Sequence, residues 1–250
     1  MVSGPVVDTA SALEFQREIT DRINENELRA IAGELSIKSA ALRELLGGDL
    51  AGLDRSDLRQ VLRWVFATRR RADAVLDLVG TRPLAAAISE LLGSSKAVAD
   101  RVDTFDMALS ELAAEPKLAG CRFDLPFELL HFTQPDRYWL WTRWIFDPEV
   151  RTGALALLTT EDVDLGAGAT RGAVYLSVGR AMAFVDETGK AAGFTAAGPG
   201  LFGVDVLLAA VYGIYMYTVF QMRMTREFNR VIPPLPDLVR RLLGVYHLEV

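Results

Sequence analysis

The chain has 250 residues, of which 50% are hydrophobic and 24% are charged, and its formal net charge is −6. This composition is typical of a globular protein with a core of its own and excludes an intrinsically disordered chain. The negative charge argues against nucleic acid as a partner, because affinity for nucleic acid comes largely from neutralised phosphates. The single cysteine, Cys121, excludes an intramolecular disulfide framework and favours a cytoplasmic location.

The first 114 residues predict a series of short amphipathic helices. Ser11 and Glu14 form a capping-box pattern, after which apolar residues recur at helical spacing. A second short helix is expected over residues 39–46, because a Gly-Gly pair follows it. The first residues lack the basic and apolar regions of a secretory signal, and we expect none.

The clearest helical pattern in the chain begins at Ser56 and ends at Gly80, with one apolar stripe and most of its arginines off that stripe. Thr81 begins the next expected helix, which ends at Gly93. A serine just after this glycine caps another helix, which extends to about Leu112. Because the stop signals lie close together, we expect neighbouring helices to pack antiparallel.

Prolines divide residues 115–148 into short pieces. These prolines are Pro116, Pro126, Pro135 and Pro148. Short helices are expected over residues 127–132 and 137–146. The segment 173–194 fits either a helix or a strand, and we favour a helix because the rest of the chain is helical. A minor β hairpin in this segment is the alternative.

These patterns predict an all-α protein in which many helices pack in an orthogonal or bundle-like arrangement. We expect two regions. Residues 1–114 form an amphipathic helical region, and residues 115–250 form a helical region built around an apolar helix over about 203–226.

The apolar helix has two further interpretations. No charged residue occurs from Val206 to Phe220, and a helix that is apolar on all sides is buried either in protein or in lipid. A membrane span needs about 20 apolar residues, whereas this run is shorter and is directly preceded by the charged Asp205. Tyr212 and Tyr215 lie in the middle of the run, where a span would favour leucine. A core helix is the main prediction, with a membrane anchor over 203–222 or a helix buried in a partner as alternatives.

The segment from Leu129 to Phe146 holds three of the four tryptophans and one of the two histidines. If it is helical, its aromatic rings project from more than one side, so one set enters the core and another covers a partner or a ligand. Large aromatic residues and arginine are enriched at binding hot spots. The candidate binding residues of this segment are His131, Asp136, Arg137, Trp139, Trp141, Arg143 and Trp144. The alternative is that the tryptophans fill the core.

His131 has acidic neighbours in Glu128 and Asp136, and a carboxylate can orient and tune an imidazole. No serine or cysteine nucleophile lies beside it in the sequence, so a hydrogen-bonded core histidine is the simpler interpretation. The glycines of residues 165–172 and 198–203 resemble phosphate loops in composition alone, and capping loops are the expected structure.

The sequence contains no catalytic or metal-binding pattern that we can identify, and it indicates no particular cofactor. Its main functional prediction is a non-enzymatic accessory or scaffold subunit that binds a protein partner, or self-assembles, through an aromatic and arginine surface. One alternative is an enzyme or binding protein with a pocket for a small apolar ligand, lined by the 203–220 helix with Tyr212 and Tyr215 and by His131. The other alternative is a protein peripheral to the membrane, anchored by the 203–222 helix.

Overall fold

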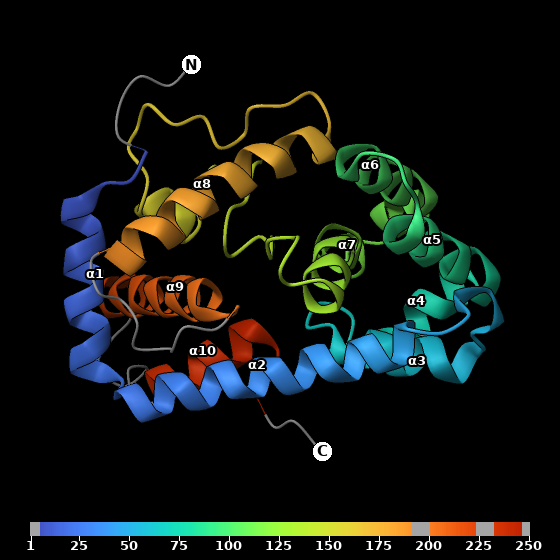
Figure 1. The fold of residues 1–250 in the computed structure, drawn as a ribbon, viewed down its shortest axis with the longest axis horizontal. Coiled ribbons are helices and arrows are strands. Elements are labelled where there is room, and N and C mark those ends of the chain that lie inside the picture. Colours follow the sequence, from blue (N-terminus) through green and yellow to red (C-terminus); the bar gives the residue numbers. More distant parts are fainter. Residues whose placement is uncertain (1–5, 192–200, 224–232, 247–250) are drawn as a thin grey trace. The chain divides into compact units, whose positions relative to one another are not determined.

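The fold is all-α, as the sequence predicts. The computed structural model describes residues 6–191, 201–223 and 233–246, and within them it contains ten helices and no sheet (Figure 1). The α-helices are α1 (Thr9–Arg22), α2 (Glu25–Leu46), α3 (Arg55–Trp64), α4 (Ala72–Val79), α5 (Thr81–Gly93), α6 (Val98–Ala108), α7 (Ala119–Thr133), α8 (Arg171–Ala191), α9 (Gly203–Arg223) and α10 (Leu235–Leu243). Short 3-10 turns lie at Leu50–Gly52, Ser110–Ala114 and Leu155–Leu157. The helix predicted over 173–194 is confirmed up to residue 191, and the rest of that segment lies outside the described residues.

The chain forms two compact units, each built from segments that are distant in the sequence. The first unit comprises residues 1–36, 144–165 and 180–250, and the second comprises residues 37–143 and 166–179. Helices α2 and α8 therefore contribute residues to both units. The predicted division into residues 1–114 and 115–250 stays a prediction.

In the first unit, α9 is buried over its first three turns and contacts α1 and α10. Gly213 allows the close approach of α10, because a Cβ atom there would lie 2.6 Å from Leu235 Cδ1. Arg240 of α10 also binds α2, where its Nη1 and Nε atoms lie 2.6 Å from Glu27 Oε1 and 2.9 Å from Glu34 Oε2. No helix within the described residues is both long enough and apolar enough to cross a membrane.

In the second unit, α7 contacts α5 and α6, and its residues are buried almost without interruption from Cys121 to Phe132. The expectation that Pro126 breaks the chain is wrong, because this proline lies inside α7. Proline has no amide hydrogen for the carbonyl four residues before it, which here belongs to Arg122. Arg171 donates to that carbonyl instead, at 3.4 Å.

Several predicted helix ends are wrong because a different residue caps the helix. Asp8, not Ser11, caps α1, and its carboxylate accepts the amide of Ala10 at 3.1 Å. Asp54, not Ser56, caps α3. The predicted helix over 39–46 is the last part of α2, a 22-residue helix.

The helix predicted over residues 137–146 is also wrong. This segment consists of turns and of chain without regular secondary structure. Trp141 is buried in the core of the second unit, while Trp139 is half-buried. The helix predicted from Ser56 to Gly80 is likewise two helices, α3 and α4, separated by a run of turns over residues 65–71.

Candidate partner-binding site

Helix α7 carries a stripe of four buried side chains that can titrate. They are Cys121, Asp124, Glu128 and His131. Their spacing of three, four and three residues places them on one face of the helix. Such groups are costly to bury unless they find partners.

Glu128 makes the central contacts of this stripe. Its Oε2 atom lies 2.7 Å from Lys38 Nζ, and the two side chains are only 2% and 0% exposed. The same oxygen accepts the backbone amide of Phe66 at 3.2 Å. Lys38 Nζ also lies 4.1 Å from the ring centroid of Phe132. The buried ion pair therefore fixes one end of the turns between α3 and α4.

Two further hydrogen bonds hold the same turns. The Cys121 thiol donates to the carbonyl of Ala67 at 3.1 Å, and the Thr68 hydroxyl donates to the carbonyl of Leu62 at 2.6 Å. Burial raises the pKa of the Cys121 thiol, which keeps it protonated and able to donate. The turns are thus preformed by side chains from α7 and from the turns themselves.

We call residues 63–71 the arginine turn, because this segment presents arginines on a fixed backbone. Arg63, Arg70 and Arg71 are exposed, and none of the three has an ion-pair partner within the part of the chain that the structure describes. The guanidinium carbon of Arg69 lies 4.8 Å from the ring centroid of Phe66. The arginine turn therefore combines positive charge with a half-buried aromatic ring.

The unneutralised charge is local, because α3 and α4 are joined by ion pairs along the rest of their length. Arg55 Nη2 lies 2.5 Å from Asp77 Oδ1, and Arg59 Nη2 lies 2.7 Å from Asp73 Oδ2. One helical turn further along α3 lies Arg63, and α4 begins only at Ala72, so α4 has no third aspartate to continue the series.

Asp124 and Arg143 lie beside the arginine turn. Burial raises the pKa of Asp124 to about 7, and the guanidinium of Arg143 opposes the rise. Asp124 accepts the backbone amide of Arg143 at 3.2 Å, and the two side chains are 4.0 Å apart. Gly120 leaves room for this arginine, because a Cβ atom there would lie 2.2 Å from Arg143 Nη2. Gly120 directly precedes Cys121, whose thiol bonds the carbonyl of Ala67, so Arg143 lies near the arginine turn.

His131 is buried, and its Nδ1 atom donates to the carbonyl of Tyr138 at 2.8 Å. Glu128, the neighbouring acid in the sequence, pairs with Lys38 instead. Of the other predicted residues, Asp136, Arg137 and Arg143 are exposed and Trp139 is half-buried.

The remaining aromatic candidates are buried or half-buried. Trp141 is fully buried, with its ring 4.9 Å from Phe123 and 4.6 Å from Phe127 between centroids. Trp144 is buried in the first unit, where its ring centroid lies 6.2 Å from that of Tyr212. Tyr212 and Tyr215 of α9 are half-buried, with centroids 5.9 Å apart.

The predicted apolar ligand pocket stays a prediction. The first unit has an apolar hollow lined by residues that include Val7, Leu13, Leu158, Val185 and Leu207. Its volume is about 30 Å³, which is room for about one water molecule and far below the roughly 300 Å³ of a small ligand site.

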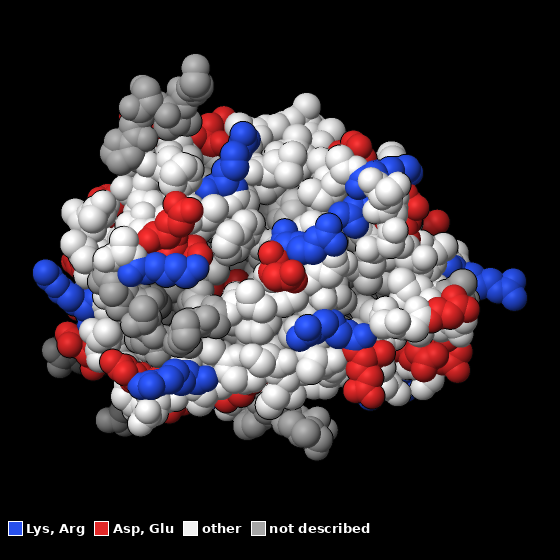
Figure 2. Space-filling model, in the orientation of Figure 1, with Lys and Arg blue, Asp and Glu red and all other residues white. Residues whose placement is uncertain are grey.

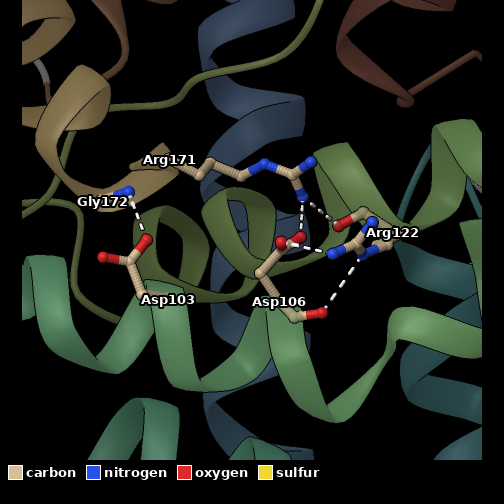
Figure 3. A network of polar contacts seen from close by, with 5 residues as sticks. All are labelled: Asp103, Asp106, Arg122, Arg171 and Gly172. Atoms are coloured by element: carbon tan, nitrogen blue, oxygen red, sulfur yellow. Dashed lines mark hydrogen bonds and ion pairs between the residues drawn. The ribbon is translucent and has the colours of Figure 1, made fainter. Parts of the chain in front are cut away.

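A second polar network fixes the start of α8, as Figure 3 shows. Asp106 of α6 pairs with both Arg122 and Arg171, and Arg122 Nη2 lies 2.5 Å from its Oδ2 atom. The amide of Gly172 donates to Asp103 at 2.8 Å, and the amide of Ala173 donates to the Thr170 hydroxyl. These two amides at the start of α8 are therefore already bonded and are not open to a phosphate.

The described residues hold no group of three or more His, Cys, Asp or Glu side chains placed to bind a metal ion. A comparison with protein-family models, with curated proteins and with solved structures finds no match to this chain.

Proposed function

We propose that this chain is a non-enzymatic accessory or scaffold subunit that binds a protein partner through the arginine turn. The observation that carries the proposal is the group of exposed arginines, Arg63, Arg70 and Arg71, which form no ion pair with any described residue and lie on a turn that buried contacts hold in place. Repulsion among like charges disfavours such a cluster in the free protein, and a partner of opposite charge would relieve it.

The titratable side chains of α7 support this proposal more than they support catalysis. Glu128, Cys121 and His131 each bond a backbone group or a buried charge within the second unit. All of them are buried, whereas a general acid or base must reach a substrate. Glu128 and Cys121 hold the arginine turn in place from the buried side, and His131 holds the backbone at Tyr138.

Charge on one face of the molecule agrees with a local site (Figure 2). On the face drawn in Figure 2, positive and negative side chains lie interspersed, and no continuous positive area covers that face. An interspersed surface favours solubility and gives little attraction for polyanions in general.

The test is chemical cross-linking in the native host, followed by mass spectrometry. We expect a defined set of cross-links between the arginine turn and one protein, which is a different chain or a second copy of this one. The triple variant Arg63→Gln, Arg70→Gln, Arg71→Gln should lose these cross-links. The matched control Arg55→Gln, Arg59→Gln, Arg82→Gln removes the same charge from exposed positions of the same unit and should keep them. An unchanged set in the first variant would refute the proposal.

A further inference from the structure

We infer that the partner presents a short acidic segment, rich in Asp or Glu, to the arginine turn. This inference rests on the proposed function and adds the chemistry of the partner. It follows from the number of arginines, from their surroundings and from the rigidity of the backbone that carries them.

Positive charge is concentrated at one end of the α3–α4 pair. The arginine turn contributes four arginines within nine residues, and Arg143 lies close by through its contacts at the start of α7. Asp124 is the nearest carboxyl to Arg143, and its raised pKa reduces its negative charge near neutral pH. The guanidinium group pairs with carboxylates through two parallel hydrogen bonds, which gives geometric selectivity as well as attraction.

The positive area is short, and this favours an acidic peptide over a nucleic acid. Asp73 and Asp77 lie in the first and second turns of α4, directly after the arginine turn, and their side chains are 53% and 70% exposed. A long polyanion that continued past the arginines would meet these carboxylates, whereas a segment of a few residues would not. Arg69 also covers the ring of Phe66, which hinders stacking of a base on that ring.

The arginine turn is preformed, so binding would order little of the backbone. Phe66, Ala67 and Thr68 are held by the three hydrogen bonds to Glu128, Cys121 and Leu62. A preorganised site loses less conformational entropy when its ligand binds.

The experiment uses the full chain and a fluorescein-labelled peptide with six consecutive glutamates. A second peptide has glutamine in place of each glutamate. Fluorescence anisotropy at low ionic strength should show binding of the glutamate peptide alone, and added salt should weaken it. The variant Arg63→Gln, Arg70→Gln, Arg71→Gln should bind at least about tenfold more weakly than the wild type, and Arg55→Gln, Arg59→Gln, Arg82→Gln should bind within about twofold of it.

Equal binding of both peptides, or no binding of either, would overturn the inference. Tighter binding of single-stranded RNA or of phosphatidylserine vesicles than of the glutamate peptide would also overturn it. The cross-linking experiment separates this failure from that of the proposed function. If cross-links to the arginine turn persist in the wild type and disappear in the arginine-turn variant while the peptide does not bind, the protein–protein function stands and the acidic partner is wrong.

Discussion

The arginine turn and the tryptophan segment, residues 129–146, both combine aromatic residues with arginine, but they are built in opposite ways. In the tryptophan segment the largest ring, Trp141, is fully buried and Trp144 is nearly so. In the arginine turn the charged groups are outside, and the polar contacts that hold them come from within. Residue types that favour an interface therefore indicate one only when the backbone places them at the surface, and for these two segments that depends on contacts distant in the sequence.

The substitution Trp141→Ala should show the largest effect, a loss of about 3–5 kcal/mol in the free energy of unfolding. Removal of this ring leaves a cavity between Phe123, Phe127 and Tyr175. Urea denaturation followed by circular dichroism measures the loss. Trp64→Ala, at a half-buried tryptophan within the arginine turn, is the control and should lower the free energy of unfolding by about 1 kcal/mol. Equal losses in the free energy of unfolding for the two variants would mean that Trp141 is no more important for the core than Trp64.

The buried pair behind the arginine turn should show the next largest effect. Lys38→Ala leaves the carboxylate of Glu128 buried without its cation, which should cost about 3 kcal/mol at neutral pH. Amide hydrogen exchange at Phe66 should become faster, because its acceptor is no longer fixed.

The double variant Lys38→Met, Glu128→Leu distinguishes charge from packing. Oε1 of Glu128 has no hydrogen-bond partner within the described residues, so the native pair is not fully compensated. We expect the free energy of unfolding of the double variant to lie within about 1 kcal/mol of that of the wild type. The amide hydrogen of Phe66 should still exchange faster than in the wild type. A double variant as unstable as Lys38→Ala would mean that the pair contributes through its shape and not through its charge.

A third prediction concerns pH and Asp124. Burial raises the pKa of this carboxyl from 3.8 to about 7 in the folded protein. Between these values the folded protein holds a proton that the unfolded chain has lost, so this group makes the protein less stable as pH rises, by about 1 kcal/mol per pH unit. Asp124→Asn keeps an acceptor for the Arg143 amide and does not titrate.

The stability of Asp124→Asn relative to the wild type should therefore increase as pH rises from 3.8 towards 7 and should level off above that. Urea denaturation at a series of pH values measures this difference. The control is Asp136→Asn, which removes the same charge from an exposed position. A constant difference between Asp124→Asn and the wild type would mean that Asp124 is ionised throughout the range.

The fold class could be predicted because helical periodicity is local in the sequence. The positions at which helices break could not, because tertiary contacts decide them. The turns at residues 65–71 depend on Glu128, which accepts a hydrogen bond from the amide of Phe66 although it lies 62 residues away in the sequence. Pro126 stays inside α7 where Arg171 supplies the donor for the carbonyl that the proline leaves unpaired.

Part of the candidate site can nevertheless be found in the sequence. Arginines recur every four residues at Arg55, Arg59 and Arg63, whereas α4 offers only Asp73 and Asp77 opposite them. This mismatch of three arginines to two aspartates marks the unneutralised end of the helix pair. This mismatch is visible only once α3 and α4 are aligned against each other, and a single helix predicted over residues 56–80 has no such alignment.

The smallest predicted effect is the one that most sharply separates the two regions. The variant Arg63→Gln, Arg70→Gln, Arg71→Gln should have a free energy of unfolding equal to that of the wild type within about 0.5 kcal/mol, or slightly higher. The reason is that the substitutions remove repulsion between like charges and break no ion pair among the described residues. The control Arg55→Gln, Arg59→Gln, Arg82→Gln loses two exposed ion pairs and should be the less stable of the two variants, a difference that thermal unfolding at low salt would reveal. The reverse order would mean that the arginine turn stabilises the protein itself. The expected order would mean that its arginines are not needed for folding, and it would leave binding as the reason that so much like charge is held together on a rigid turn.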